Sequence, residues 1–198
     1  MKAVIFDFDG VIHNTLNLAY GINKEMFGNN LSLEKYKDIF NGNIYKHEAI
    51  TEEASNKFFE LQKKEFDNLR IEESIKKELL KLKDKYMLFI ISSNKEDTLN
   101  IYLKNNNILN IFDRVLGVET HKSKIEKFKI LFEEYNFDKG NCIFVTDTLG
   151  DILEANKLGV NTIAVDFGFH ERSRLEKGFP KKIISNFDEI FSYVENLN

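Results

Sequence analysis

The sequence lacks several features that are typical of particular classes of protein. A single cysteine, Cys142, excludes an internal disulfide framework, and a single proline, Pro180, excludes a proline-rich linker. No apolar run reaches membrane-spanning length, and the first residues show no signal-peptide pattern. We therefore expect a soluble, cytoplasmic protein without a membrane partner.

Strong charge of one sign is also missing. The chain has 28 Lys and Arg against 32 Asp and Glu residues, with a formal net charge of −4. A nucleic-acid polymer requires a basic face, so we expect no such partner. The 198 residues, 42% of them hydrophobic, suffice for one large domain or for a core with a small insertion. Cys142 lies in the apolar run Cys-Ile-Phe-Val, which favours a buried thiol over a nucleophile.

Residues 2–10 form the stretch around which the rest of the sequence is organised. Four apolar residues run from Ala3 to Phe6, which is typical of a strand buried on both faces of a parallel sheet. Asp7 and Asp9 follow, two residues apart, so their side chains share a face if the strand continues. Two carboxylates at the end of a buried strand are costly unless a cation pairs with them. The alternative is a strand that ends in solvated acids.

Apolar runs alternate with helical periodicity in the second part of the chain. This alternation predicts an α/β fold with a parallel sheet and right-handed crossovers. Ligands of such sheets bind beyond the carboxyl ends of the strands. We expect strands over 86–91, 114–118, 142–147, 162–166 and 182–184, and helices over 95–106, 123–136, 148–158 and 187–194.

The segment between the first two predicted strands is too long for a simple crossover. Apolar residues recur there at helical spacing, both between Ile50 and Leu69 and between Ile71 and Leu82. We expect an inserted helical cap over residues 15–82, with the core formed by residues 1–14 and 83–198. Five phenylalanines of the insertion are expected to form its own core rather than a surface that stacks against substrate: Phe27, Phe40, Phe58, Phe59 and Phe66.

Polar residues end three of the predicted strands, at what should be one edge of the sheet. Besides Asp7 and Asp9, Ser92 with Ser93 ends the second strand and Asp147 ends the fourth. Such carboxylates suit Mg²⁺, which is typically held by one or two carboxylates together with substrate phosphate. A serine hydroxyl and the N–H groups that follow it can bind phosphate, but a serine here can equally cap a helix.

Asp151 and two lysines are further candidates for this site. Asp151 lies four residues after Asp147 across a helix start, so the two acids can share a face; the alternative is an acid favoured by the helix dipole. A lysine is needed to balance the charge of a phosphate. Lys122 and Lys124, in Thr-His-Lys-Ser-Lys, precede an amphipathic helix, and either can serve or be a solvated surface residue.

The order of these motifs resembles the haloacid dehalogenase (HAD) superfamily, whose members are mostly Mg²⁺-dependent phosphatases. Asp7-Phe-Asp-Gly resembles its nucleophile motif, the apolar run ending in Ser92 its phosphate-binding motif, and Val145–Asp151 its acidic metal motif. The insertion is similar to the cap of the phosphoglycolate phosphatase and β-phosphoglucomutase-like branch. The resemblance implies a Rossmann-like parallel-sheet core with an inserted helical cap.

Three positions depart from the family pattern. Lys122 lies close to the usual family spacing before the acidic motif, but no proline follows it, so Lys124 stays an alternative. Asn14 stands where the family often has an acid, and Thr146 where it usually has glycine. These departures remove no essential functional group.

For this sequence the resemblance implies a two-step phosphatase that acts on a small phosphorylated metabolite with Mg²⁺ as cofactor. Asp7 would become phosphorylated and Asp9 would be the general acid and base. The metal site would use Asp7, the Asp9 carbonyl, Asp147 and Asp151, and the phosphate site Ser92, Ser93, Lys122 and Lys124. A phosphomutase acting on a sugar phosphate and a catalytically silent HAD-fold regulatory protein are the alternatives. A dehalogenase, which does not need Asp9 or the metal, is disfavoured by the complete set of acids.

Overall fold

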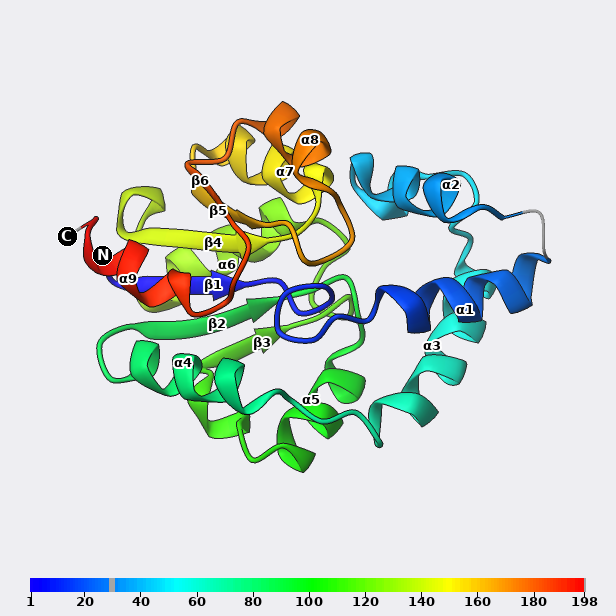
Figure 1. Ribbon diagram of the computed structural model, residues 1–198, viewed down its shortest axis with the longest axis horizontal. Helices are drawn as coiled ribbons and strands as arrows, with labels where there is room; N and C mark the ends of the chain where they lie inside the picture. Colours follow the sequence, from blue (N-terminus) through cyan, green and yellow to red (C-terminus); the bar gives the residue numbers. More distant parts are fainter. Residues whose placement is uncertain (29–30, 198) are drawn as a thin grey trace.

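The computed structural model describes residues 1–28 and 31–197 and contains a six-stranded parallel sheet (Figure 1). The strand order is β3-β2-β1-β4-β5-β6, and every neighbouring pair is parallel. The predicted α/β fold is therefore confirmed. The strands are β1 (Ala3–Phe6), β2 (Met87–Ile91), β3 (Arg114–Leu116), β4 (Cys142–Thr146), β5 (Asn161–Val165) and β6 (Lys182–Ile184).

Helices follow the strands as the alternation in the sequence predicts. Gly159 ends α7 in the left-handed conformation, at φ 70°, which glycine adopts without strain. None of the helices in the described ranges combines the length and hydropathy that a membrane span requires. In the second part of the chain the helices are α5 (Glu96–Asn105), α6 (Lys124–Tyr135), α7 (Leu149–Leu158), α8 (Arg172–Leu175) and α9 (Glu189–Glu195), with 3₁₀ turns η3 (Leu109–Ile111), η4 (Lys139–Asn141) and η5 (Glu176–Gly178).

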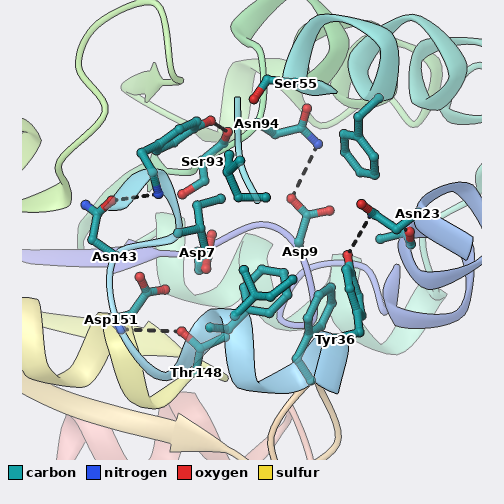
Figure 2. Close-up of a pocket in the computed structure, with 18 of the residues that line it drawn as sticks. Asp7, Asp9, Asn23, Tyr36, Asn43, Ser55, Ser93, Asn94, Thr148 and Asp151 are labelled. Atoms are coloured by element: carbon teal, nitrogen blue, oxygen red, sulfur yellow. Dashed lines mark hydrogen bonds between the residues drawn. The ribbon is translucent and has the colours of Figure 1, made fainter. Parts of the chain in front are cut away.

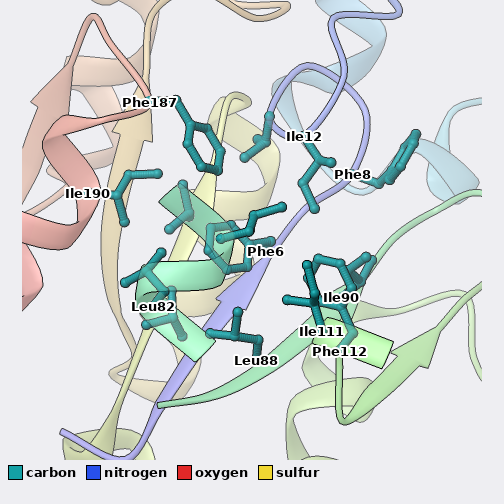
Figure 3. Packing of buried hydrophobic residues seen from close by; sticks show 14 of the residues in the cluster. Phe6, Phe8, Ile12, Leu82, Leu88, Ile90, Ile111, Phe112, Phe187 and Ile190 are labelled. Atoms are coloured by element: carbon teal, nitrogen blue, oxygen red, sulfur yellow. The ribbon is translucent and has the colours of Figure 1, made fainter. Parts of the chain in front are cut away.

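β1 lies at the centre of the sheet, and its alternate residues contribute to two separate cores. Val4 and Phe6 pack on one face, and Ala3 and Ile5 on the other, because residues two apart on a strand share a face. Side chains of α5 and α9 cover the first face, and those of α6 and α7 the second. Figure 3 shows Phe6 in the first core. Cys142 is buried in the second core, as predicted.

The segment between β1 and β2 forms helices, most of which lie beyond the carboxyl ends of the strands (Figure 1). α1 packs against α3, and η1 lies against α7. The hydroxyls of Ser32 and Thr51 cap α2 and α3 by accepting hydrogen bonds from backbone N–H groups of the first turn. The elements are α1 (Leu16–Phe27), α2 (Leu33–Asp38), η1 (Ile39–Asn41), η2 (Ile44–Lys46), α3 (Glu52–Phe66) and α4 (Glu73–Lys83).

α4 differs from the other helices of the predicted insertion because it packs against the sheet. Leu79 and Leu82 are fully buried in the same core as Val4, and the helix contacts β2 and α9. The predicted insertion of residues 15–82 thus includes one helix, α4, that packs on the sheet. The division into a core and a cap stays a prediction.

Candidate active site

Asp7 and Asp147 lie side by side because β1 and β4 are neighbours in the sheet. The ladder between these strands continues past β1, where the Asp7 N–H donates to the Val145 carbonyl at 2.9 Å. The Phe8 N–H donates to Asp7 Oδ1 at 2.7 Å and so fixes the carboxylate. Asp7, Asp9 and Asp147 therefore meet at one edge of the sheet. Asp7, Asp9 and Asp151 lie around the same space (Figure 2).

Gly10 makes the turn after Asp9 and leaves room for Asp147. Its φ of +74° lies in the region that favours glycine. A Cβ atom at this position would lie 1.8 Å from Asp147 Oδ2, so no side chain fits here. The Gly10 N–H donates to the His13 carbonyl at 2.8 Å, which closes the turn.

Asp147 is held by the loop that follows β5. The Phe169 N–H donates to Asp147 Oδ2 at 2.7 Å, and a Cβ atom at Gly168 would lie 2.4 Å from the same oxygen. Asp147 is fully buried, and among the described residues its Oδ1 has no hydrogen-bond partner. Burial raises the pKa of Asp147 to about 8, although the Phe169 N–H favours the charged form. An unpaired buried carboxylate oxygen is costly, so this atom fits a ligand of a cation.

Asp9 is positioned from two sides. The Thr15 hydroxyl donates to Oδ1 at 2.6 Å. Asn94 Nδ2 donates to Oδ2 at 3.4 Å, as Figure 2 shows. Burial raises the pKa of Asp9, although both hydrogen bonds favour the ionised form. A carboxyl group that keeps its proton closer to neutral pH can act as a general acid.

Lys124 lies between two of the carboxylates. Its ammonium is 2.6 Å from Asp7 Oδ2 and 2.5 Å from Asp151 Oδ2. Thr146, where the family usually has glycine, donates its hydroxyl to the same Asp151 oxygen at 2.9 Å. Burial raises the pKa of Asp7 despite the lysine. For Asp151 burial acts in the same direction, but Lys124 and the hydrogen bonds outweigh it and lower the pKa.

Lys122, by contrast, does not reach the carboxylates. Its ammonium lies over the ring of Tyr45, 5.6 Å from the centroid, on the outside of the site. The sequence did contain a signal for this difference. Lys124 is spaced four and seven residues before Phe128 and Leu131, on the buried face of α6, whereas Lys122 precedes the helix.

The two serines after β2, Ser92 and Ser93, lie in different environments. Ser92 is fully buried; its Oγ accepts the Asn94 N–H at 3.0 Å, and its carbonyl accepts a hydrogen bond from the ammonium of Lys127. Ser93 and Asn94 line the cavity over the carboxylates, and Ser92 does not. Of the two serines that we expected at the phosphate site, the structure thus places only Ser93 at the cavity, and it adds Asn94, which the sequence did not single out.

A cavity of about 110 Å³ lies over Asp7, and residues of the inserted segment line one side of it. Tyr45 of η2 donates its hydroxyl to the Ser93 carbonyl at 2.5 Å, and Asn43 Nδ2 donates to Glu154 Oε1 of α7 at 3.1 Å. Space between η1 and α7 is tight: a Cβ atom at Gly150 would lie 2.3 Å from the Gly42 carbonyl oxygen. These contacts join the insertion to the core around the cavity.

Four of the five phenylalanines that we expected in the core of the insertion line this cavity: Phe27, Phe40, Phe58 and Phe59. Phe40 and Phe58 also pack in a hydrophobic cluster with Ala19 and Tyr36 of the insertion. Phe66 alone of the five packs in the main core, 5.6 Å from the ring of Phe8. The expectation was wrong for Phe66, and it did not foresee that the other four line the cavity, because an apolar helical stripe has the same spacing whether it faces another helix or a cavity.

The residues present fit a Mg²⁺ ion. Within the described ranges no three His, Cys, Asp or Glu residues are grouped so as to hold a metal by themselves. Mg²⁺ does not need such a group, because one or two carboxylates, substrate phosphate and water complete its shell. The unpaired Oδ1 of Asp147 and the neighbouring Asp7 carboxylate supply two oxygen ligands of this kind.

A parallel sheet with a cluster of carboxylates at the ends of its central strands defines an α/β protein of the Rossmann-like type. The chain belongs to the family described as haloacid dehalogenase-like hydrolase, whose model matches residues 4–165. The resemblance found in the motifs is thereby confirmed. No curated protein matches the sequence.

Solved structures agree with this assignment at the level of the fold. A haloacid dehalogenase-like hydrolase from Streptococcus pneumoniae has a TM-score of 0.81 at 20% identity, with 98% of each chain covered. A predicted phosphoglycolate phosphatase from Haemophilus somnus has a TM-score of 0.78 at 20% identity and the same coverage. A putative β-phosphoglucomutase from Thermotoga maritima has a TM-score of 0.74 at 18% identity, with both chains covered completely.

Proposed function

We propose that this protein is a Mg²⁺-dependent phosphatase that hydrolyses a small phosphate monoester through an aspartyl-phosphate on Asp7. The observation that carries the proposal is the geometry around Asp7: its carboxylate pairs with Lys124 at 2.6 Å and lies at the same sheet edge as Asp9 and Asp147. Membership of a hydrolase family supports it, as do neighbours described as phosphatases. The inserted helices α1 to α3 would act as the cap.

Asp7 supplies the nucleophile. An oxygen of its carboxylate attacks phosphorus, and the bond from phosphorus to the ester oxygen breaks as the new bond forms. The Phe8 N–H and the Lys124 ammonium hold the two carboxylate oxygens in place before the attack. The same ammonium offsets negative charge on the phosphoryl oxygens in the transition state.

Asp9 moves the proton. Its protonated carboxyl gives the proton to the departing ester oxygen, and its ionised form then takes one from the water that attacks the aspartyl-phosphate. Thr15 and Asn94 orient the carboxyl, and burial raises its pKa, which favours the protonated form that the first step needs. Without a second acid this step would be slow.

The phosphate group would lie between Lys124 and the polar residues that follow β2. Ser93 and Asn94 line the cavity on that side and can donate hydrogen bonds to phosphoryl oxygens. Asp7, the Asp9 carbonyl and Asp147 would hold the metal, with Asp151 fixing Lys124. When bound, Mg²⁺ neutralises charge on the phosphate and aligns it with Asp7.

Phosphate release from an aryl phosphate tests this function. Wild type should release phosphate with Mg²⁺ and not with EDTA, and Asp7→Asn should lose the activity while it keeps its circular dichroism spectrum. Asp166→Asn is the matched control, because Asp166 also follows a strand but pairs with Arg172 outside the cavity. Full activity of Asp7→Asn would refute the covalent mechanism. Metal-independent release would refute the role of Mg²⁺.

A further inference from the structure

The two sides of the cavity differ in charge. We call the cavity-lining residues between Ala19 and Gln62 the cap wall, and those from α6, α7 and the loops that follow β1, β2, β4 and β5 the core wall. All charged residues that line the cavity belong to the core wall, and the described residues of the cap wall include no Lys, Arg, His, Asp or Glu. The part of a substrate that lies beyond the phosphate therefore meets an uncharged surface.

Lys124 is the only cationic side chain among the described residues that line the cavity, and it is already engaged with Asp7 and Asp151. Two other lysines lie nearby but outside the lining. Lys122 stands over the ring of Tyr45, and Lys95 over the ring of Phe59 at 5.4 Å. A carboxylate or a second phosphate on the leaving group would thus be buried without a cation, at a cost on the order of several kcal/mol.

Aromatic rings make up much of the cap wall. Phe58 and Phe59 follow one another on α3 with their rings edge to face at 5.8 Å, and Phe40 contacts Phe169 edge to face at 4.9 Å. Such rings favour an apolar carbon skeleton, because burial of apolar surface contributes about 25 cal/mol per Å².

Gln62 adds one polar requirement. Its side chain is 1% exposed and lines the cavity, and its Oε1 has no hydrogen-bond partner within the described part of the chain. A buried amide oxygen without a partner is unfavourable, and a hydroxyl group of a bound molecule would satisfy it. A neutral donor is enough for this purpose, so Gln62 does not require a charged ligand.

We infer that the substrate is the phosphate monoester of a small, uncharged alcohol with an apolar skeleton and a further hydroxyl group that bonds to Gln62. The inference rests on the proposed phosphatase function and names its substrate class. The cavity volume of about 110 Å³ favours a small leaving group over a nucleotide. Leaving groups with a carboxylate or a second phosphate are excluded.

Matched esters test the exclusion of charge. With wild type, kcat/KM should be about 100-fold higher for the phosphate ester of glycolamide than for 2-phosphoglycolate, which has the same shape and one more negative charge. Benzyl phosphate should be a better substrate than either. A 2-phosphoglycolate value equal to or above that of the amide would overturn the inference and leave the proposed function intact.

A gain of charge in the cap wall should weaken the preference for the uncharged ester. Ser55 is half-buried, lines the cavity and points toward it in Figure 2. Ser55→Lys should reduce the preference for the amide about tenfold, because a cation then faces the carboxylate. Asn56→Lys adds the same charge at the adjacent exposed position and should leave the preference unchanged. Equal effects of both variants would show a general effect of charge and contradict the inference.

A third pair of esters tests Gln62. Wild type should prefer 3-hydroxypropyl phosphate to propyl phosphate about tenfold, and Gln62→Leu should abolish this preference while it still hydrolyses propyl phosphate. A preference that survives in Gln62→Leu would refute the assigned hydrogen bond. If no ester releases phosphate in an Asp7-dependent way, the proposed function fails, and the substrate class fails with it.

Discussion

The core wall and the cap wall face one another across the cavity, but different physical factors determine which residues form them. The core wall collects acids from strand ends that the parallel sheet brings together, so its composition follows from the strands themselves. The cap wall collects apolar side chains from separate helices, and its composition follows only from how those helices pack. Chemistry and selectivity can therefore change independently in this protein. The variants below separate the two walls.

The largest effect should come from the lysine of the core wall. Lys124→Met removes the cation between Asp7 and Asp151, and we expect kcat/KM to fall about 100-fold or more, as for other groups that stabilise transition-state charge. Lys122→Met is the matched control, since that lysine contacts the ring of Tyr45 instead, and its effect should be less than about threefold. Steady-state kinetics of both variants measure these changes in kcat/KM. The opposite order of effects would move the phosphate-binding role to Lys122.

Gly10 provides the second test, on the backbone of the core wall. Gly10→Ala places a methyl group 1.8 Å from Asp147 Oδ2 at a positive φ, so the free energy of unfolding should fall by about 1–3 kcal/mol and activity should be lost. Gly21 is exposed on α1, and a Cβ atom there would have no neighbour within 4 Å, so Gly21→Ala should be neutral or slightly stabilising. Urea unfolding measures both. A stable, active Gly10→Ala would show that the strand end tolerates another geometry.

A pH-dependent stability should come from Lys127, behind the core wall. Burial, together with the charge of Lys124, lowers the pKa of Lys127 to about 7. Above this pH the unfolded chain still binds a proton that the folded chain has released at Lys127, so the contribution of Lys127 to the free energy of unfolding should rise with pH between about 7 and 10. The slope is at most about 1.4 kcal/mol per pH unit.

Comparison with Lys127→Met isolates this contribution. Wild type should gain stability relative to the variant as the pH rises through this window, in unfolding measurements at several pH values between about 7 and 10. Lys129→Met, at an exposed position of the same helix, should follow the wild-type curve. Parallel curves for wild type and Lys127→Met would mean that the buried amine stays charged.

The smallest effect should come from the contact between the two walls. Tyr45→Phe removes the hydrogen bond to the Ser93 carbonyl, which should raise KM by a factor of several, in line with about 1 kcal/mol for one such bond. Tyr20→Phe removes a similar bond, to the Leu31 carbonyl, but within the insertion. It should lower stability by a comparable amount and leave KM unchanged. Equal KM values for the two variants would show that the contact does not serve the site.

Much of the core wall could be predicted because the relevant signals are local. A buried apolar run followed by an acid places Asp7 or Asp147 at a strand end, whatever the rest of the chain does. The choice between Ser92 and Ser93 could not be predicted in this way, since both faces of the sheet are covered and alternation carries no information there. The choice between Lys122 and Lys124 as the lysine of the site depended on which face of α6 packs on the sheet.

The composition of the cap wall could not be predicted, for a different reason. The stripe that includes Phe58 correctly indicated a helix, but the spacing of apolar residues reports only which side of a helix avoids water. It does not report whether another helix or a cavity lies on that side. The orphaned amide of Gln62 is likewise visible only in three dimensions, because a glutamine within α3 has no unusual local pattern.

The central place of β1 in the sheet has a consequence for the synthesis of the protein on the ribosome. Ala3–Phe6 leave the ribosome before the other strands, but their second neighbouring strand, β4, follows only at Cys142–Thr146. Until then one edge of this wholly apolar strand stays unpaired, and such edges are templates for aggregation. Any pause in translation before β4 is made therefore lengthens the time for which this edge of β1 is exposed.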